Sequence, residues 1–304
     1  MTQTATARPD APTSDVPTPN AMSVDVEDYY QVWALSFAIK REDWDDIAPR
    51  VVEATTRVLD LFDRTGAKGT FFALGCVAER HPDLIRDIVG RGHELGSHGY
   101  DHKKVFDLSQ DAFLEETRRT RTILEDIAGV EARGYRAAGF SIDERTPWAH
   151  EMLMEAGHAY SSSIHPIDHD HYSAPDAPLT PYRPVAGADF AEIPVGVAEL
   201  FGRRITCAGG GRFRLWPTVW TASLIDRVNR KDGRSAVFYF HPWEVDPDQP
   251  KVDGLPWKSR FRHYVNLDRM EGKLEALCRR FVWDRIDRVF PEAAVGAPNL
   301  KAAE

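Results

Sequence analysis

The sequence predicts an α/β fold in which parallel strands alternate with helices and close into a barrel. Strand-like runs of β-branched and aromatic residues recur along the 304 residues, with helix-like stretches between them. This alternation favours a parallel sheet with crossover helices, either closed as a barrel or open and doubly wound. The polar residues discussed below follow the ends of the strand-like runs. Because active sites of barrels lie at the C-terminal ends of their strands, we prefer the closed form.

The first third of the chain supplies three predicted strands and two predicted helices. The apolar run at residues 21–26 ends in carboxylates, and residues 69–74 are β-branched and aromatic, as is typical of a buried parallel strand. A third run leads into His98. Between these strands, residues 51–62 carry apolar side chains at helical spacing, and residues 82–89 begin with a proline, which helices accept in their first turn.

The rest of the chain continues the alternation and brings the number of predicted strands to seven. The later strands are expected at residues 134–137, 160–164, 192–197 and 235–240. Further helices are expected at about residues 109–127, 146–156 and 267–287.

One barrel with extensions accounts for the length, since an α/β barrel commonly occupies about 200 to 250 residues as a single domain. We expect a disordered leader at residues 1–20 and the barrel at residues 21–245. A C-terminal extension at residues 246–290 should pack on the barrel, and residues 291–304 should form a flexible tail. The leader is rich in Thr, Ala and Pro and lacks the basic start and apolar segment of a secretion signal.

The composition argues against several classes of partner. A net charge of −9 provides no basic stripe for a phosphate backbone, so neither nucleic acid nor a polyanionic substrate is expected, and a neutral or cationic substrate fits better. The three cysteines are widely spaced and encode neither a disulfide framework nor a thiolate zinc site. No apolar run approaches the roughly 20 residues that span a bilayer, so no stable membrane insertion is expected. These features predict a cytoplasmic protein and leave its oligomeric state unknown.

Two groups of polar residues suggest a metal site. His98 and His102 are four residues apart, and in a single helical turn their rings would lie on one face, as a shared metal requires. Asp25, Glu27 and Asp28 place like charges at one strand end, a repulsion that a bound cation removes. One carboxylate with two imidazoles leaves a coordination position open for water, whose pKa zinc lowers to about 7.

These residues belong to motifs that occur in a known order. The motifs are Asp-x-Glu-Asp at 25–28, His-Gly-Tyr-Asp-His at 98–102, Tyr-Arg-Ala at 135–137 and Phe-His-Pro-Trp-Glu at 240–244. The order resembles that of the polysaccharide deacetylases, the NodB-homology group of carbohydrate esterase family 4. Residues 239–247, 262–264 and 266–267 resemble the branch found in exopolysaccharide and exosortase-associated loci. The resemblance covers about residues 21–290.

The resemblance implies an irregular (β/α)7 barrel of the NodB-homology type with a C-terminal helical extension. It implies a hydrolase that removes N-acetyl groups from amino sugars of a polysaccharide or its precursor, in exopolysaccharide biosynthesis. It also implies a divalent metal cofactor, with zinc as the expected ion and cobalt or another divalent ion as alternatives. His98 and His102 would be ligands, and the third ligand would be Glu27 or Asp28.

The catalytic roles are likewise implied by the resemblance. Asp25 would be the general base, and Arg136 would hold it in its ionised form. His241 would be the general acid that protonates the leaving amine. A backbone N–H near Gly139 would donate to the oxyanion.

This chain departs from the family pattern at two positions. Ala138 stands where a proline is common, which affects a groove wall and not the chemistry. Ser161 stands where the family usually has an aspartate that tunes the acid histidine. Either Glu244 or another acid then replaces that aspartate beside His241, or the enzyme is slow.

Alternative interpretations stay open at this point. His241 is also explained as a core histidine, and Arg136 as a structural ion-pair partner. The loop at residues 165–171 is interpreted as solvated and lining a sugar groove in preference to a second metal site. The alternative functions are a cyclic amide or ureide hydrolase on the same fold, and an inactive glycan-binding protein.

Overall fold

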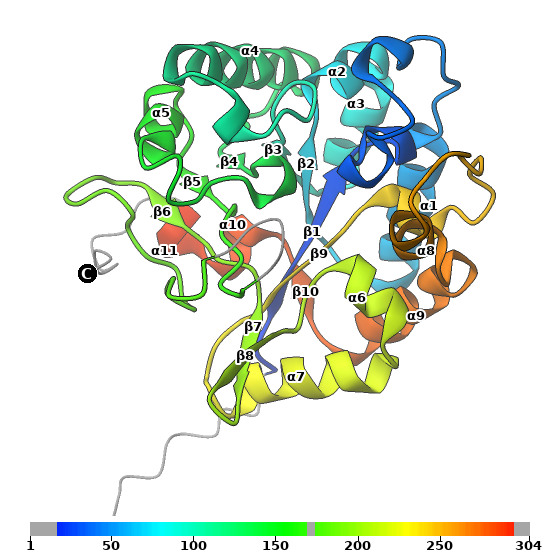
Figure 1. The fold of residues 1–304 in the computed structure, drawn as a ribbon. Coiled ribbons are helices and arrows are strands. Elements are labelled where there is room, and N and C mark those ends of the chain that lie inside the picture. The colour runs from blue at the N-terminus through cyan, green and yellow to red at the C-terminus, as the bar shows by residue number, and fades with distance from the viewer. Residues whose placement is uncertain (1–16, 169–173, 295–304) are drawn as a thin grey trace, which may run out of the picture.

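A computed structural model describes residues 17–168 and 174–294 of the chain (Figure 1). Within them, one curled sheet has eight parallel strands: seven lie in the order β9-β1-β2-β3-β4-β5-β6, and a short eighth strand, described below, pairs with the start of β1. The bounds of the seven are β1 Asn20–Val26, β2 Thr70–Ala73, β3 Glu94–Ser97, β4 Gly134–Tyr135, β5 Tyr160–Ser161, β6 Ala191–Glu192 and β9 Val237–Phe240. All the strands predicted from the sequence are present, and the predicted irregular α/β barrel is confirmed.

The barrel is irregular where it closes between β6 and β9. No ladder joins these two strands in the described part of the chain; instead the backbone N–H of Gly196 donates to the carbonyl of Val237 at 2.9 Å. A Cβ atom at position 196 would lie 2.9 Å from that same carbonyl oxygen. Glycine is therefore required for the close approach that links the two ends of the sheet.

Helices surround the sheet, with α4 and α5 at the top of Figure 1 and α7 at the bottom. Their bounds are α1 Val51–Thr65, α2 Gly75–Arg80, α3 Pro82–Gly90, α4 Gln110–Ala128, α5 Ala149–Glu155, α6 Gly210–Leu215, α7 Thr218–Arg230, α8 Trp257–Tyr264 and α9 Leu267–Arg280. Sequence signals set their ends: the Ser109 hydroxyl caps α4 by accepting from the Ala112 N–H, and Gly129 ends it with a φ of 67°. Among the described residues, no helix has the length and apolarity needed to cross a membrane.

The C-terminal region differs from its prediction. The helix expected at residues 267–287 ends at Arg280, and Trp283–Asp284 form a strand, β10, that pairs with the start of β1. The N–H of Asn20 donates to the carbonyl of Val282, and the N–H of Lys68 donates to the carbonyl of Trp283. The β10 segment therefore links the N-terminal ends of β1 and β2. Pairing with the sheet overrides the helical spacing of the sequence here. The extension therefore completes the sheet.

Two short helices follow β10, and one of them corrects the predicted tail. Helix α10 is Ile286–Val289 and α11 is Pro291–Ala294. The tail expected to be flexible from residue 291 therefore begins with α11, because Ala293 and Ala294 are buried in one cluster with Tyr160 and Phe72. The barrel also begins one residue before its predicted boundary, since β1 includes Asn20.

One antiparallel hairpin was missed by the sequence analysis. Residues 192–197 were expected to form one strand, but β6 ends at Glu192, and Val197–Leu200 form β7, which pairs with β8 at Arg203–Thr206. The run from Ile193 to Ala198 contains Pro194 and Gly196, and these two strand-interrupting residues were the available signal for the break.

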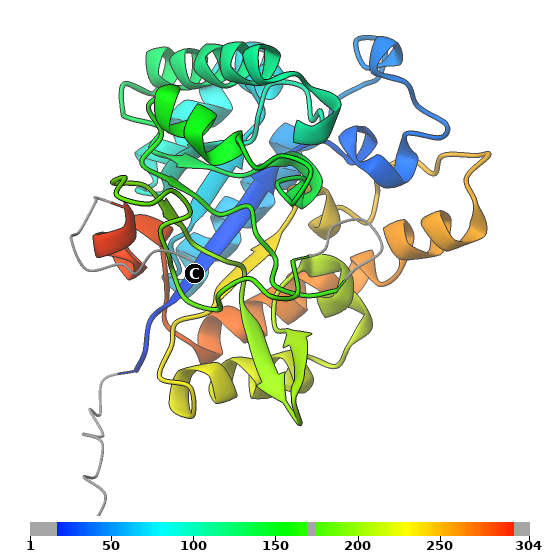
Figure 2. The same ribbon diagram turned by 60° about the vertical axis from the view of Figure 1, so that its left-hand side comes forward.

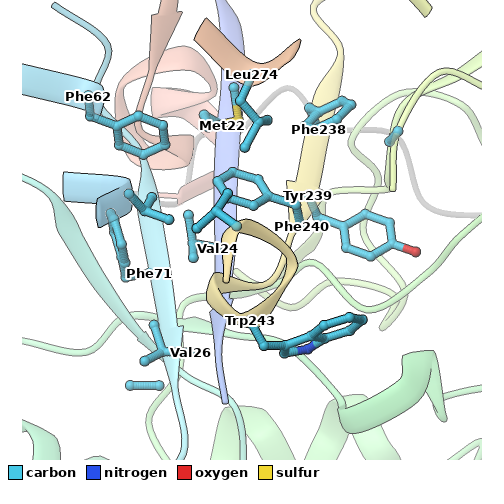
Figure 3. Close-up of a cluster of buried hydrophobic side chains, with 14 of the residues drawn as sticks. Met22, Val24, Val26, Phe62, Phe71, Phe238, Tyr239, Phe240, Trp243 and Leu274 are labelled. Atoms are coloured by element: carbon cyan, nitrogen blue, oxygen red, sulfur yellow. The ribbon is translucent and has the colours of Figure 1, made fainter. Parts of the chain in front are cut away.

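The largest hydrophobic cluster fills the space between the sheet and the helices α1 and α9. Met22, Val24 and Val26 of β1 belong to it and lie on one side of that strand (Figure 3). The same cluster includes Phe62 from α1, Phe71 from β2, Phe238 and Phe240 from β9, and Leu274 from α9. Strand β1 runs through the middle of the fold (Figure 2). Apolar packing against the neighbouring strands and helices fixes its position in the sheet and the direction of its side chains. Polar residues described below lie on or directly after this strand.

A buried carboxyl group ties together the N-terminal end of the barrel. Glu94 of β3 accepts from the Tyr160 hydroxyl at 2.8 Å, from the Thr70 hydroxyl at 2.5 Å and from the Asp287 backbone N–H at 3.2 Å. Burial, with the nearby Asp287 charge, raises the pKa of Glu94 to about 7. The protonated acid is therefore the form that the fold favours.

Stability should consequently depend on pH through Glu94. Because the pKa is higher in the folded chain than in the unfolded chain, this contribution is complete below about pH 4.5 and is lost as the pH rises through about 7. We expect the free energy of unfolding to lose roughly 2 kcal/mol from this group between pH 5 and pH 8. Urea unfolding of the wild type and of Glu94→Gln at both pH values measures it. An identical pH dependence in the two proteins would contradict this assignment.

Candidate functional site

The first strand and the turn after it supply two buried carboxylates to the inside of the barrel. Successive side chains of a strand point to opposite faces. Since Met22, Val24 and Val26 face the helices, Asp25 faces the interior, and it is 2 % exposed. Glu27, which is 1 % exposed, follows the end of β1 in a tight turn, where its N–H donates to the Asp25 carbonyl at 3.0 Å. The end of β1 and this turn thus place two carboxylates near His241.

The loop after β3 carries the two histidines, but it is a bend and the predicted helical turn is wrong. Gly99 and His102 both have positive φ values, of 78° and 60°. The loop is held by backbone bonds from Gly75 to Gly99 and from Cys76 to Tyr100, each 3.0 Å long. The chain doubles back, and the rings of His98 and His102 meet at a centroid distance of 5.4 Å.

Glu27, His98 and His102 form a group with the geometry of a metal site. One ligand atom from each lies within 4.8 Å of the others. Nδ1 of His98 contacts the carbonyl oxygen of Arg136 at 2.9 Å, which leaves Nε2 as the coordinating atom. Burial lowers the pKa of His98 to about 4, so its ring is neutral at pH 7, as a ligand must be.

The carboxylate of Glu27 also fits a cation. Its buried Oε2 lies 2.8 Å from Nε2 of His102, but it has no well-aligned hydrogen bond. Burial by itself would raise the pKa of Glu27, but the rings of His102 and His241 outweigh burial and lower that pKa to about 2. An ionised, incompletely satisfied carboxylate beside two imidazoles matches the donor set of a three-ligand zinc centre.

Asp28, the other predicted candidate for the third ligand, is not part of this group. One of its oxygens accepts from the Tyr29 N–H at 2.8 Å, and the other accepts from the N–H groups of Arg50 and Val51 at 2.7 and 2.9 Å. These bonds satisfy backbone donors at the start of α1. Burial raises the pKa of Asp28 to about 6 against these bonds. The geometry therefore places Glu27 at the centre and gives Asp28 a structural role.

Arg136 lies beside Asp25 at the end of β4. Its Nη1 donates to Asp25 at 3.1 Å, and its Nη2 donates to the hydroxyls of Ser23 and Ser162 at 3.1 and 3.0 Å. The guanidinium is fully buried and lies over the Phe72 ring at 4.6 Å. An ion pair of this kind is costly to break from one side. This ion pair therefore fixes the orientation of the Asp25 carboxylate.

His241 reaches the same space from the end of β9. Its Nε2 lies 3.4 Å from Glu27 and 4.0 Å from Asp25, and its Nδ1 lies 2.8 Å from Oε1 of Glu244. Burial disfavours the imidazolium, but Glu27, Glu244 and Asp25 outweigh it and raise the pKa of His241 to about 9. The ring is therefore a cation at pH 7 and holds a proton on Nε2, beside the candidate metal site.

Glu244 is the acid that contacts His241, in place of the aspartate that is expected at position 161 and is a serine in this chain. The Ser161 hydroxyl donates to Ser163 at 2.8 Å and has no contact with His241. Oε2 of Glu244 accepts from Arg214 at 2.8 Å, and this guanidinium, together with His241, keeps the pKa of Glu244 low despite burial. A Cβ atom at Gly210 would lie 2.1 Å from Glu244, so the glycine makes room for this carboxylate.

Arg214 and Trp243 were not predicted as members of the site. Trp243 stacks on His241 at 5.4 Å and on His263 at 4.4 Å, and its indole N–H donates to Glu27 at 3.3 Å. Trp243 belongs to the same sequence motif as His241, and this membership could have identified it as a site residue. Nothing local marks Arg214, whose partners lie 30 or more positions away in the chain.

A cavity of about 450 Å³ opens beside these residues. Its lining includes Trp33, His165, Tyr239, His241 and Trp243. Aromatic walls with a few polar groups suit a sugar ring. His165 belongs to the loop predicted to line a sugar groove, and it bonds the Thr206 hydroxyl at 2.8 Å; residues 169–171 of that loop lie outside the described residues.

Comparison with known families gives two matches that together cover most of the chain. Residues 43–159 match the family model described as polysaccharide deacetylase, and residues 162–291 match a domain of unknown function, DUF3473. His98, His102 and Arg136 lie in the first segment, while His241 and Glu244 lie in the second. Asp25 and Glu27 precede both segments. The site is therefore built from three parts of the chain.

Curated proteins and solved structures agree with the first match. The chain is 31% identical over 102 residues to a peptidoglycan-N-acetylglucosamine deacetylase of Bacillus cereus, covering 33% of this chain and 37% of that protein. It is 27% identical over 108 residues to a peptidoglycan deacetylase of Helicobacter pylori, covering 36% of each. The matched segments thus span about a third of these relatives.

One solved structure matches nearly the whole chain. It comes from Mycobacterium smegmatis and is assigned to the polysaccharide deacetylases; it covers 98% of this chain and 97% of its own, with a TM-score of 0.61 and 22% identity. This likeness shows that the fold, including the C-terminal extension, is shared.

The two acidic neighbours Glu27 and Asp28 offer a direct test of the site. We expect Glu27→Gln to lose most of its bound zinc, because it removes a charged ligand. The matched variant Asp28→Asn should keep its zinc and lose up to about 1 kcal/mol of stability, because it weakens a helix cap. Metal content after dialysis and thermal unfolding measure both. The reverse pattern would make Asp28 the ligand.

Proposed function

Residues 43–159 of the chain belong to the polysaccharide deacetylase family, and from this premise we propose that the protein is a divalent-metal-dependent hydrolase. It removes N-acetyl groups from amino sugars of a polysaccharide or its precursor. The observation that carries the proposal is that Glu27, His98 and His102 lie together, with the buried carboxylate of Asp25 and the imidazole of His241 beside them.

A divalent ion held by Glu27, His98 and His102 would polarise the amide carbonyl and make a water molecule more acidic. Zinc is the proposed ion, because two neutral imidazoles and one carboxylate leave a position open in its usual tetrahedral shell. The rest of the chemistry belongs to side chains of the chain itself.

Asp25 acts as the proton acceptor for the attacking water. It is not part of the ligand group, it lies at the end of β1 close to Glu27, and its only strong partner among the described residues is Arg136. The guanidinium fixes the position of the carboxylate beside the ligand group. Ser23 and Ser162 bind the other end of Arg136 and so hold Asp25 in place.

His241 acts as the proton donor to the leaving amine nitrogen. Its Nε2 faces Glu27 and Asp25, and its Nδ1 is bonded to Glu244, which orients the ring and favours its charged form. Trp243 stacks on the ring and restricts its rotation. Glu244 supports the interpretation of an active enzyme over that of an inactive glycan-binding protein, because it supplies the charge that Ser161 lacks.

The substrate and location are part of the proposal. The aromatic cavity beside His241 supports a glycan in preference to a small cyclic amide. Cys76, Cys207 and Cys278 are free and buried, which supports a reducing compartment such as the cytoplasm. A role in exopolysaccharide biosynthesis, on a glycan precursor, fits this location.

Acetate release from chitooligosaccharides tests the proposal. The zinc-loaded protein should release acetate, a chelator should abolish the release, and zinc or cobalt should restore it. We expect Asp25→Asn to keep its metal and to lose activity by about 10²-fold to 10⁴-fold, as loss of a general base does. Turnover of cyclic imides without acetate release would favour the cyclic amide hydrolase. Glycan binding at background turnover in both the wild type and Asp25→Asn would favour the inactive binding protein.

The pH profile tests the partnership of His241 and Glu244. The acid must be protonated, so kcat/KM should fall as the pH rises through the pKa of His241, which the Glu244 carboxylate helps to raise. In Glu244→Gln the neighbouring negative charge is lost, and the falling limb should move to lower pH by about 1 to 2 units. The surface variant Glu271→Gln is the control. An unmoved limb in folded Glu244→Gln would contradict this role.

A further inference from the structure

The cavity beside His241 is bordered by cationic side chains, although the chain as a whole is acidic. Arg212 of α6 and Arg262 of α8 both line it. Other arginines on neighbouring elements are paired, as Arg260 of α8 is with Asp253 at 3.7 Å and Arg204 of β8 is with Glu199 at 3.7 Å. Among the residues that the structure describes, neither Arg212 nor Arg262 has a carboxylate within ion-pair distance.

Within the described residues, the lining of the cavity offers no unpaired carboxylate. Of the side chains that line it in the described chain, Glu244 is the one carboxylate. One of its oxygens bonds His241, and the other bonds Arg214 at 2.8 Å. The contact of Arg212 is with the ring of Trp216, at 5.8 Å, which leaves its guanidinium protons available. The described side chains that line this cavity therefore carry a net positive charge.

The two arginines are set on a rigid frame. Arg214 belongs to α6, as Arg212 does, and its guanidinium donates to the backbone carbonyls of Arg262 at 2.9 Å, His263 at 2.6 Å and Val265 at 3.0 Å. Buried hydrogen bonds of this kind join α6 to α8. Arg212 and Arg262 are thereby held at one wall of the cavity that also contains the candidate proton donor.

We propose that this wall binds an anionic group of the glycan, so that the enzyme acts on an acidic glycan or a glycan phosphate. The inference rests on the proposed function and adds the substrate class. A guanidinium offers paired N–H donors that match the two oxygens of a carboxylate or phosphate. The group would sit on the sugar next to the N-acetylated one, or on the same sugar as a phosphate. The net charge of −9, which favoured a neutral or cationic substrate, is carried elsewhere on the surface.

The test compares substrates that differ in charge. A hyaluronan tetrasaccharide alternates glucuronate with N-acetylglucosamine, chitotetraose is its neutral counterpart, and UDP-N-acetylglucosamine carries the charge as phosphate. Acetate release by the zinc-loaded enzyme gives kcat/KM for each. We expect at least one anionic probe to exceed chitotetraose by about fivefold or more, with the advantage shrinking as salt is added.

The substitutions locate the effect. Arg262→Gln and Arg212→Gln should each reduce the ratio of anionic to neutral kcat/KM to about 1 or 2, a loss typical of one charge-assisted contact. Arg260→Gln, on the same helix and outside the cavity, should leave the ratio as it is in the wild type. A preference for UDP-N-acetylglucosamine over hyaluronan would identify the anion as phosphate. Equal rates on all three probes, unaffected by either cavity variant, would overturn the inference.

Binding separates this inference from the proposed function. If no probe loses acetate, the proposed hydrolase fails, and the affinities of Asp25→Asn for hyaluronan tetrasaccharide and chitotetraose still decide whether the cavity selects charge. Tighter binding of the anionic probe that disappears in the double variant Asp25→Asn, Arg262→Gln supports the inference; equal affinities overturn it.

Discussion

The structure depends on the burial of two carboxylates, Asp25 and Glu27, at the end of the first strand. Removing an ion from water costs several kcal/mol even after the protein relaxes, so each charge needs a partner. The guanidinium of Arg136 donates a hydrogen bond to Asp25 at 3.1 Å. The carboxylate of Glu27 contacts His102, His241 and Trp243. The fold around β1 can be understood as the arrangement that brings these partners within reach.

Distant segments converge for this reason. The loop after β3 brings His98 and His102, β4 brings Arg136, and β9 brings His241, all at the C-terminal ends of parallel strands. The second half of the chain then adds a layer behind His241, in which Glu244 and Arg214 form a buried ion pair 2.8 Å long. The deacetylase-like segment and the DUF3473 segment thus each hold part of one site, and neither contains it alone.

Much of this arrangement could be predicted from local patterns. The strands are continuous buried runs, and the alternation of Val24, Asp25 and Val26 indicates which face each residue takes. The pairing of His98 and His102 was predicted for the wrong reason: their spacing suggested a helical turn, while a bend at Gly99 brings the rings together.

What could not be predicted depends on contacts far apart in sequence. Asp28 resembles its neighbour Glu27 in charge, yet backbone donors at Arg50 and Val51 bind its carboxylate. The role of Glu244 becomes visible only when Arg214 and Gly210 are placed beside it. Strand β10 is two residues long and owes its existence to pairing with β1, which overrides the helical pattern before it.

The most direct measurement is anomalous diffraction at the zinc edge from crystals of the zinc-loaded protein. The account predicts one strong peak bounded by the carboxylate of Glu27 and the Nε2 atoms of His98 and His102, with Asp25 outside the ligand shell. A peak on Asp28, or no peak between β1 and the loop after β3, would contradict it.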